Sequence, residues 1–240
     1  MDPFLRTRWL IGTDAVDHLQ KSRVLVFGVG GVGGFSIEAL ARAGVGRLDI
    51  VDYDRVDVTN INRQIIATTA TVGELKVDAM KARIASIVPE TEVRTYPIMF
   101  NEANAEKINF SDYDYVVDAV DQVTAKLLII EKAKACGMPV LSAMGAGNKL
   151  HPEQLELAML SETKICPLAR VMRREVKKRG LGDLPVVYSK EAPKKVEGLD
   201  ARSPASISFV PSAAGLIAAS KVVRDLVQSE KEDSLVRELQ

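Results

Sequence analysis

The sequence has few cysteines, few aromatic residues and no excess charge of either sign. Its 240 residues include two cysteines, Cys136 and Cys166, which lie far apart in the chain. Two scattered thiols cannot form a four-cysteine zinc site, and they favour a reducing compartment. We interpret Cys136, near the end of a predicted helix, as a core residue. The role of Cys166, in a loop, is left open.

Aromatic residues make up 5% of the chain, and 32 basic residues balance 32 acidic ones. Few aromatics argue against stacking on many nucleic-acid bases, while the zero net charge neither favours nor excludes nucleic acid. The N-terminus lacks the apolar core of a signal peptide. The most apolar late stretch, 207–223, contains Pro211, three serines and Lys221, so a core strand followed by a core helix fits better than a membrane span. We expect a cytoplasmic protein without stable membrane insertion.

Short apolar segments alternate with helical patterns in the first half of the chain. Strands are predicted at 23–28, 47–54, 92–97, 115–121 and 139–145. Helices are predicted at 34–44, 72–87 and 126–137, with a short one at 103–108. This alternation predicts an α/β fold with a Rossmann-like, doubly wound, mostly parallel sheet.

The second half of the chain changes character. It contains predicted strands at 155–160 and 186–189, a basic helix at 167–180 and a polar loop at 189–204. A loop of this length is usually functional or mobile. We predict one domain over 1–240, in which 1–145 binds a nucleotide. Residues 146–240 add an antiparallel portion and face the substrate, with a mobile loop at 189–204.

A glycine-rich turn follows the first predicted strand. The letters GVGGVG fit the pattern G-x-G-x-x-G between a strand and a helix. Gly28 permits the tight turn, Gly30 and its neighbour Gly31 bring backbone N–H groups to a phosphate, and Gly33 lets the helix approach the sheet. Asp52 ends the second strand, where a carboxylate can accept hydrogen bonds from a ribose. The turn alone favours NAD, because most such motifs bind dinucleotides, but it does not exclude ATP.

A second polar group favours a triphosphate over a dinucleotide. It consists of Asp54, Asn60, Asn62, Arg63 and Gln64, followed by Lys76 on the next predicted helix. A triphosphate carries more negative charge than the pyrophosphate of NAD, and cleaving it calls for an arginine and a lysine. Each residue also has an ordinary alternative: Lys76 as a solvated helix lysine, and Asn60 and Asn62 as turn formers.

Two aspartates, Asp118 and Asp121, lie where the fourth predicted strand ends. Carboxylates at this edge of a doubly wound sheet lie on the ligand side, where one of them can hold Mg²⁺ bound to phosphate oxygens. Asp118 has the alternative role of a helix cap.

These motifs resemble the ubiquitin-activating-type adenylating superfamily, which includes the ThiF, MoeB and HesA proteins. The matching segments are GVGGVG, VDYDRVDVTNINRQ, Gly73 with Lys76, and DAVDQ. The resemblance implies a domain that binds Mg·ATP, adenylates a carboxylate and releases pyrophosphate. It implies that Asp52 holds the ribose, that Asn60, Arg63 and Lys76 hold the phosphates, and that Asp121 binds the metal.

The N-terminal segment RTRWLIG resembles the opening segment of that superfamily, in which an arginine reaches the ATP of a partner subunit. This resemblance implies a homodimer. Arg6 is the residue that would act across the interface, with Arg8 as the alternative.

The second half resembles the tRNA threonylcarbamoyladenosine dehydratases, through PLARVMRREVKKRG, VVYSKEAP and SFVPSAAGLIAASKVV. These enzymes close the threonyl carboxylate of the modified adenosine into a ring at the expense of ATP. Two departures are Cys166, where an aspartate is expected, and Ala205-Ser206, where Gly-Ser is usual. The implied function is ATP-dependent dehydration of threonylcarbamoyladenosine in tRNA.

Three other functions remain in view. Adenylation of the C-terminus of a ubiquitin-like or sulfur-carrier protein shares the ATP site, but such enzymes usually carry two C-x-x-C pairs, and this sequence has none. An NAD-dependent oxidoreductase would leave Arg63, Lys76 and Asp121 without a role. A non-catalytic nucleotide sensor would not need every ATP-handling residue.

The basic residues are concentrated in one quarter of the chain. Residues 162–202 hold eleven basic and six acidic residues, so this segment is positive and the remainder equally negative. Such a segment attracts phosphate without sequence specificity, or is simply a solvated basic helix. The sequence leaves open which tRNAs are used, how the base is seated, and whether a sulfur-relay protein docks.

Overall fold

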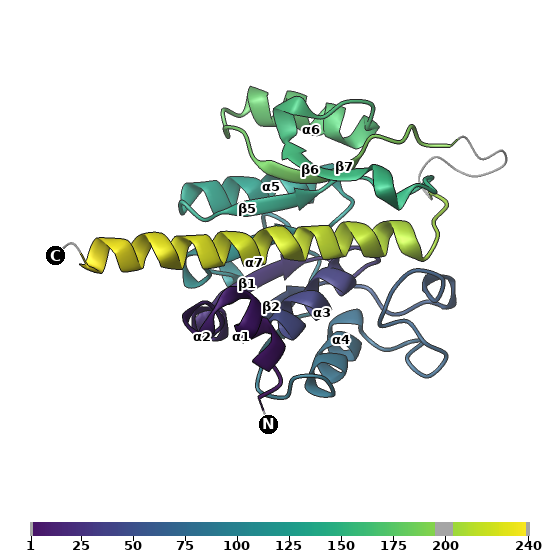
Figure 1. Cartoon of the computed structure of the whole chain (residues 1–240). Helices are drawn as coiled ribbons and strands as arrows, with labels where there is room; N and C mark the ends of the chain where they lie inside the picture. Colours follow the sequence, from purple (N-terminus) through teal and green to yellow (C-terminus); the bar gives the residue numbers. More distant parts are fainter. Residues whose placement is uncertain (1, 195–203, 239–240) are drawn as a thin grey trace.

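A computed structural model describes residues 2–194 and 204–238 of the chain. Seven strands form a single sheet in the order β3-β2-β1-β4-β5-β7-β6 (Figure 1). Their bounds are Arg23–Phe27 (β1), Arg47–Val51 (β2), Glu92–Tyr96 (β3), Tyr115–Asp118 (β4), Val140–Ala143 (β5), Leu155–Met159 (β6) and Pro185–Ser189 (β7). All neighbouring pairs are parallel except β6 and β7, which are antiparallel. The predicted mostly parallel sheet with an antiparallel extension is therefore confirmed.

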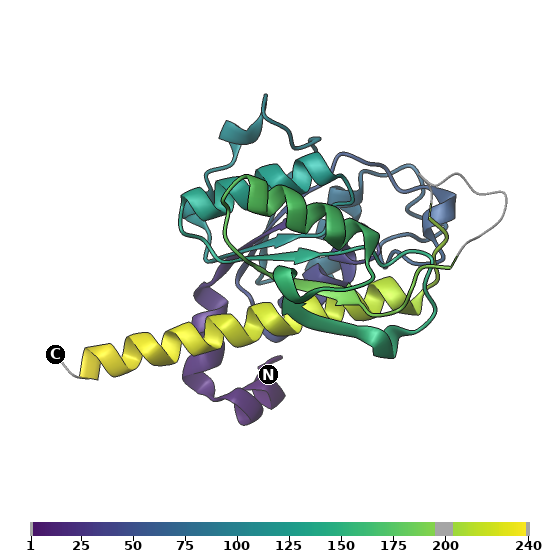
Figure 2. The same ribbon diagram turned by 90° about the horizontal axis from the view of Figure 1, so that it is seen from above.

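Helices cover both faces of this sheet. Their bounds are Leu5–Ile11 (α1), Thr13–Lys21 (α2), Gly33–Ala43 (α3), Lys76–Ala85 (α4), Val123–Ala135 (α5), Pro167–Lys178 (α6) and Phe209–Glu238 (α7). Short 3-10 turns occur at Val58–Asn60, Ala105–Lys107, Phe110–Asp112, Pro152–Gln154 and Leu160–Glu162. Seen from above, α5 and α6 lie on one side of the sheet and α7 on the other (Figure 2).

Strand β1 shows why a hydrophobic core forms on each face of the sheet. Because successive side chains of a strand point to opposite faces, Val24 and Val26 join the core packed by α3, α4 and α7, whereas Leu25 and Phe27 join the core packed by α5 and α6. All four side chains are completely buried. A strand buried on both faces needs a continuous apolar run, which is what VLVF supplies.

The strand order creates a crevice at the carboxyl edge of the sheet. From β1 the chain moves outward to β2 and β3, then crosses back to β4 on the other side of β1. Where the connections from neighbouring strands diverge in this way, a crevice forms between them, and in a doubly wound sheet this crevice is the ligand site. In the register, Phe27 pairs with both Val51 and Asp118, so the segments after β1, β2 and β4 emerge side by side.

The structure corrects the prediction for residues 207–223. No strand occurs there, and α7 begins at Phe209. Pro211 lies in the first turn of α7, where its missing N–H removes no helical hydrogen bond. The helix crosses α3 closely, because Gly215 has no side chain and its carbonyl oxygen accepts a hydrogen bond from the Ser36 hydroxyl at 3.0 Å.

Smaller corrections concern element ends and one cysteine. The helix predicted at 72–87 begins at Lys76, and the strand predicted at 115–121 ends at Asp118. The helix predicted at 103–108 is only a 3-10 turn. Cys136 is exposed rather than part of the core, since it caps the end of α5, while Cys166 is buried.

Residues 195–203 of the loop predicted at 189–204 lie outside the described residues, so its mobility stays a prediction. No helix within the described ranges is both long enough and apolar enough to cross a bilayer.

Candidate nucleotide site

The glycine turn joins β1 to α3 at the carboxyl edge of the sheet. Gly28 has a φ of 91°, in the left-handed region that favours glycine. A Cβ on Gly28 would lie 2.7 Å from the carbonyl oxygen of Ala119, and a Cβ on Gly33 would lie 1.8 Å from the carbonyl oxygen of Gly28. At Gly30 a Cβ would meet nothing within 4 Å. The turn is therefore tightly packed toward the sheet and open at Gly30, and the start of α3 adds partial positive charge.

Gly31 connects this turn to two other parts of the chain. A Cβ on Gly31 would lie 3.1 Å from the side chain of Pro211 and 3.4 Å from the backbone oxygen of Arg63. The start of α7 and the segment that carries Arg63 thus pack against the turn.

Asp52 fastens the glycine turn to the segment after β2. Its Oδ2 accepts a hydrogen bond from the Val29 N–H at 2.7 Å, and its Oδ1 accepts one from the Asp54 N–H at 2.8 Å. Burial raises the pKa of the Asp52 carboxyl, and the charge of Lys76 and the two N–H groups offset this only in part. Each oxygen keeps a lone pair that can accept a ribose hydroxyl.

Lys76 is a buried cation, not the solvated helix lysine that the sequence left open. It is the first residue of α4 and is 6% exposed. Its Nζ lies 2.7 Å from Oδ2 of Asp54, and its backbone N–H donates to the Asp54 carbonyl oxygen at 3.0 Å. Asp54 retains a 46% exposed side chain. A desolvated ammonium needs an anionic partner, and here Asp54 provides it at the rim of the crevice.

In the segment from Asn60 to Gln64, some polar side chains form the turn and others keep donors that a ligand can use. The Oδ1 of Asn60 accepts the Asp57 N–H at 3.1 Å and shapes the 3-10 turn, as its turn-forming alternative predicts. Asn62 donates through Nδ2 to the Ser206 carbonyl oxygen at 3.0 Å. Arg63 uses one nitrogen, NH1, to donate to the Thr59 carbonyl oxygen and to Oδ1 of Asn62. No other hydrogen bond to a described residue engages this guanidinium, so its remaining donors are available to a ligand.

Gln64 carries an unsatisfied acceptor. Its side chain is 7% exposed, and in the described part of the chain its Oε1 is the one buried side-chain nitrogen or oxygen without a hydrogen-bond partner. Leaving a buried acceptor unpaired costs about 1–3 kcal/mol. A donor from a ligand bound beside the glycine turn would remove that cost.

The two aspartates after β4 have different environments. Asp118 is completely buried, and its Oδ2 lies 3.0 Å from Nζ of Lys126 and 2.5 Å from the Ser142 hydroxyl. Its Oδ1 accepts the Val120 N–H at 3.2 Å. Asp118 is therefore engaged in holding the turn that packs on Gly28, so it is neither a free ligand nor the cap of α5, which is Gln122.

Asp121 is the free carboxylate of this pair. It is exposed, and no hydrogen bond or ion pair joins it to any other described residue. Burial raises the pKa of the Tyr53 hydroxyl, and the charges of Asp54, Asp121 and Asp52 raise it further. The three carboxylates therefore lie around one tyrosine at the mouth of the crevice. The described residues contain no cluster of three histidines, cysteines or acidic residues that could hold a metal by themselves.

Arg6 lies in α1, near the end of α3 that is opposite the glycine turn. The preceding Phe4 packs on Gly44, the residue that ends α3, whereas the glycine turn is at the start of this helix. A helix of this length separates the two by roughly 16 Å. Arg6 is exposed and has no partner among the described residues, while Arg8 is held by Asp2 at 2.7 Å and by other oxygens. Arg6 thus cannot serve the crevice of its own chain.

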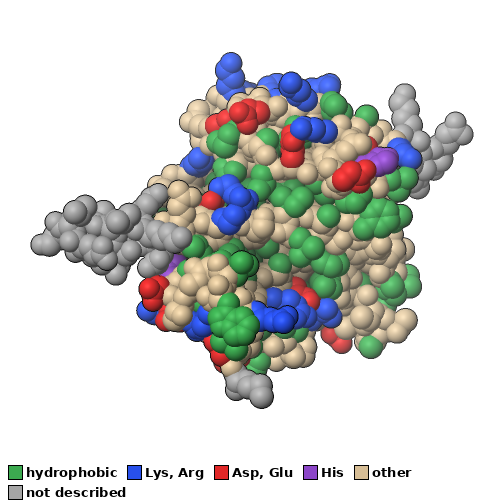
Figure 3. All heavy atoms as spheres, in the orientation of Figure 1, with side chains coloured by type: hydrophobic (Ala, Val, Ile, Leu, Met, Phe, Trp, Pro, Cys, Tyr) green, Lys and Arg blue, Asp and Glu red, His purple; other side chains and the backbone are tan. Residues whose placement is uncertain are grey.

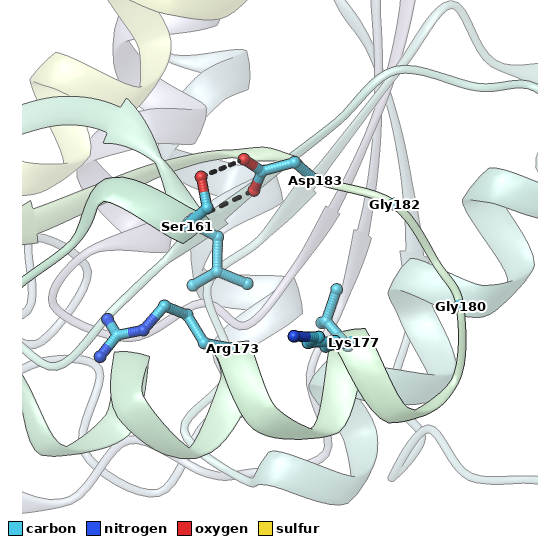
Figure 4. A pocket seen from close by; sticks show the side chains of 8 residues that line it. Ser161, Arg173, Lys177, Gly180, Gly182 and Asp183 are labelled. Carbon is cyan, nitrogen blue, oxygen red and sulfur yellow. Dashed lines mark hydrogen bonds between the residues drawn. The ribbon is translucent and has the colours of Figure 1, made fainter.

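A cavity of about 440 Å³ beneath α6 is distinct from this crevice (Figure 4). Leu160, Arg173, Lys177 and Asp183 are among its lining residues, and the Ser161 hydroxyl donates to Oδ2 of Asp183 at 2.5 Å. These residues come from the turn after β6, the second half of α6 and the loop before β7. In this sheet those segments lie at the edge opposite the glycine turn.

Sequence reasoning missed the residues that support the crevice. Lys126 was assigned only to a helix, and nothing in its neighbours signals that it is buried against Asp118. Ser142 and Ser206 also contribute through contacts between segments far apart in the chain. The one available signal for Lys126 is Asp118 itself, because an aspartate buried at a strand end requires a charged or hydrogen-bonding partner.

Comparison with known proteins agrees with this geometry. A model described as the ThiF family matches residues 5–239. A tRNA threonylcarbamoyladenosine dehydratase of Bacillus subtilis is 42% identical over 242 residues, covering 94% of this chain and 94% of the relative. The Escherichia coli relative of that name is 36% identical over 194 residues, covering 78% of this chain and 72% of the relative. A crystal structure of E. coli tRNA N6-threonylcarbamoyladenosine dehydratase, TcdA, in complex with ATP has a TM-score of 0.87 and 31% identity, covering 96% of each chain.

Proposed function

The chain belongs to the ThiF family, and we propose that it uses ATP to dehydrate threonylcarbamoyladenosine in tRNA. One observation carries the proposal: a buried lysine, Lys76, stands with Asp54 beside a glycine turn. A triphosphate needs such a cation, whereas a dinucleotide is held mainly by the backbone and the helix start. Relatives that share most of the chain's length bear the name of this activity.

ATP binds with its phosphates over the turn at Gly30 and the start of α3. Asp52 accepts the ribose hydroxyls, and the free Oε1 of Gln64 accepts a further donor from the nucleotide. Lys76 and the unused donors of Arg63 face the phosphates. A bound triphosphate competes with Asp54 for Lys76, and the half-exposed Asp54 side chain has room to turn away.

Asp121 is the residue that would hold Mg²⁺. Its exposed, unpartnered carboxylate offers the oxygen ligands that Mg²⁺ prefers, and phosphate oxygens and water supply the others. Bound Mg²⁺ would neutralise charge on the phosphate oxygens. Asp118 cannot share this role, because Lys126 and Ser142 already occupy both sides of its Oδ2.

The chemistry is a carboxylate activation followed by ring closure. The threonyl carboxylate attacks the α-phosphorus of ATP, pyrophosphate leaves, and an acyl-adenylate forms. A nucleophile of the same modified adenosine then attacks the acyl carbon, loses its proton and expels AMP. One carboxylate oxygen leaves in AMP, so the product lacks the elements of one water. The protein acts mainly by orienting the reactants and by stabilising the departing pyrophosphate with Lys76 and Arg63.

We propose that two copies of the chain complete each site. Arg6 is remote from the crevice of its own chain, and α1 around it exposes Leu5, Trp9 (72% exposed) and Leu10 (84% exposed). Exposed apolar side chains in such a group are typical of an interface. In a homodimer this surface would be covered, and Arg6 would reach the phosphates bound by the partner.

We propose that the 1–145 half binds the nucleotide and that the 146–240 half faces the tRNA. A tRNA substrate agrees with the cytoplasmic setting expected from the two scattered cysteines. A sulfur-relay protein is a further partner to be tested by co-purification.

The function is tested by incubating the protein with ATP, Mg²⁺ and tRNA that carries threonylcarbamoyladenosine. Mass spectrometry of the nucleosides should show the loss of one water, with one AMP and one pyrophosphate formed per product. When the threonyl carboxylate carries ¹⁸O, the label should appear in AMP. An unchanged nucleoside would refute the proposal, and adenylation of a carrier protein instead would identify the alternative activity.

A further inference from the structure

Every long side chain on the outer face of α6 is cationic. The helix buries Ala169, Met172 and Val176 against the sheet. The opposite face carries Arg170, Arg174 and Lys178, and Lys177 lies at its margin, where it also lines the cavity beneath α6; all four are exposed. At 3.6 residues per turn these four fall within an arc of about 100° and span about 12 Å along the axis. Figure 3 shows lysine and arginine side chains along the upper edge of the molecule, where Figure 1 places α6.

The structure separates the basic residues whose side chains already have hydrogen-bond or ion-pair partners from those whose side chains do not. Arg179 pairs with Glu131 at 2.9 Å and with Glu175 at 2.7 Å. Arg173 donates to the Thr163 carbonyl oxygen at 2.7 Å. Both side chains therefore support the fold.

Three cations of the outer face have no such contact. Among the described residues, no hydrogen bond or ion pair engages the side chains of Arg170, Lys177 or Lys178. Arg174 pairs with Glu175 at 3.0 Å but remains 73% exposed. We call these four residues the α6 stripe.

The α6 stripe begins near the edge of the sheet that holds the crevice. Cys166, the residue before α6, lies within electrostatic range of Lys149 in the loop after β5. That loop leaves the carboxyl edge of the sheet, as the glycine turn does. From there the helix runs toward the opposite edge, where the loop after it leads into β7. A polyanion lying along α6 would thus have one end near the crevice.

We propose that the α6 stripe binds the phosphate backbone of the substrate tRNA. This inference rests on the proposed function, which supplies a polyanionic substrate. Unpaired cations repeated along one helix face match repeated phosphates, and an interface of this kind releases counterions when it forms. The stripe has no aromatic side chain for stacking on bases, so it positions the tRNA without reading its sequence.

The test uses the full chain with three substitutions, Arg170→Gln, Lys177→Gln and Lys178→Gln. A matched control removes three charges elsewhere through Lys21→Gln, Lys81→Gln and Lys107→Gln, which are exposed and have no side-chain partner among the described residues. The Kd for tRNA carrying threonylcarbamoyladenosine is measured from 50 to 200 mM salt, together with the Kd for ATP without tRNA.

We expect the α6 variant to bind tRNA about tenfold or more weakly at the lowest salt, and the slope of log Kd against log salt to fall by about 2 to 3. The Kd for ATP and the kcat at saturating tRNA should be unchanged, and the control should match the original chain. A purely structural role of these side chains would instead lower kcat and the melting temperature.

Equal tRNA affinity in the α6 variant and the control would overturn the proposal. The proposal would also be overturned if the α6 variant lost binding to anionic phospholipid vesicles while its tRNA binding stayed intact, because the stripe would then serve a membrane surface. The outcome is separable from that of the proposed function. If the original chain binds tRNA through the stripe without dehydrating it, the function fails and the surface stands. If the α6 variant and the control bind tRNA equally tightly and both dehydrate it, the surface fails and the function stands.

Discussion

The ammonium of Lys126 lies 3.0 Å from the carboxylate of Asp118, and both side chains are completely buried. Lys126 also donates to the Ala143 carbonyl oxygen at 2.7 Å, and Asp118 also accepts the Val120 N–H. The pair ties the first turn of α5 to the ends of β4 and β5. Because the turn after β4 packs on Gly28, this ion pair supports the floor of the nucleotide crevice.

Replacing Lys126 by methionine should therefore destabilise the whole chain. The substitution leaves Asp118 buried without its cation, a change that costs about 3–5 kcal/mol. Urea unfolding measures the free energy. The control is Lys134→Met on the same helix, whose exposed side chain should contribute no more than about 1 kcal/mol. A Lys126→Met protein as stable as the control would contradict the role assigned to the pair.

Removing the two cations proposed to face the phosphates should lower turnover much more than stability. In the proposed mechanism Lys76 and Arg63 stabilise the departing pyrophosphate, so Lys76→Ala or Arg63→Ala should each lower kcat by about 10²- to 10³-fold, as loss of one transition-state donor does. The exposed Lys81 on the same helix as Lys76 provides the control, Lys81→Ala. Full turnover by a protein that carries both Lys76→Ala and Arg63→Ala would refute the proposed triphosphate site.

Loss of the Asp121 carboxylate should uncouple ATP binding from Mg²⁺. In the original chain, added Mg²⁺ should tighten ATP binding. In Asp121→Asn this gain should fall at least about tenfold, because a neutral amide is a weaker ligand for a hard cation. Calorimetric titration with and without Mg²⁺ measures the difference, and Glu90→Gln serves as an exposed acidic control. An Asp121→Asn protein with the full Mg²⁺ effect would place the metal elsewhere.

Arg6 should act on the site of the partner chain. Arg6→Ala and Lys76→Ala proteins should each be nearly inactive alone. After equal amounts are unfolded, mixed and refolded, heterodimers would contain one site with both residues intact, and activity should return to about a quarter of the original. If Arg6 acted within its own chain, no heterodimer site would be complete and the mixture would stay inactive.

Glu38 should make stability depend on pH in the acidic range. Burial works against its charge, but hydrogen bonds from Arg83 and Arg42 outweigh this and lower the pKa of Glu38. A lowered folded-state pKa means that the stabilisation is complete above the unfolded pKa of about 4.3 and is lost as the pH falls through the folded value. Glu38→Gln should thus be less stable than the original chain at pH 7 and nearly equal at pH 2.5. Equal deficits in unfolding free energy at both pH values would contradict this.

Local patterns were sufficient for the nucleotide-binding half of the fold. The apolar run before Gly28, the glycines at Gly30 and Gly33, and the carboxylate at Asp52 occur at fixed spacings along the chain. Each of these features sets the conformation of residues close to it in sequence. The strand, the turn, the helix and the mostly parallel sheet could therefore be predicted. The failures came where local patterns are ambiguous. The apolar residues before Pro211 suit a strand or a buried helix, and only packing against α3 selects the helix.

The sequence by itself determined the sheet, the glycine turn and the set of polar residues available for ATP. It could not show which of them are free. The tertiary structure pairs Asp118 with Lys126 and leaves Asp121 exposed, buries Lys76 beside Asp54, and puts Arg6 beyond reach of its own crevice. The same holds for α6, where Arg173 and Arg179 are engaged and Arg170, Lys177 and Lys178 are not. Whether a charge is buried, paired or free depends on segments far apart in the chain, and folding alone brings those together.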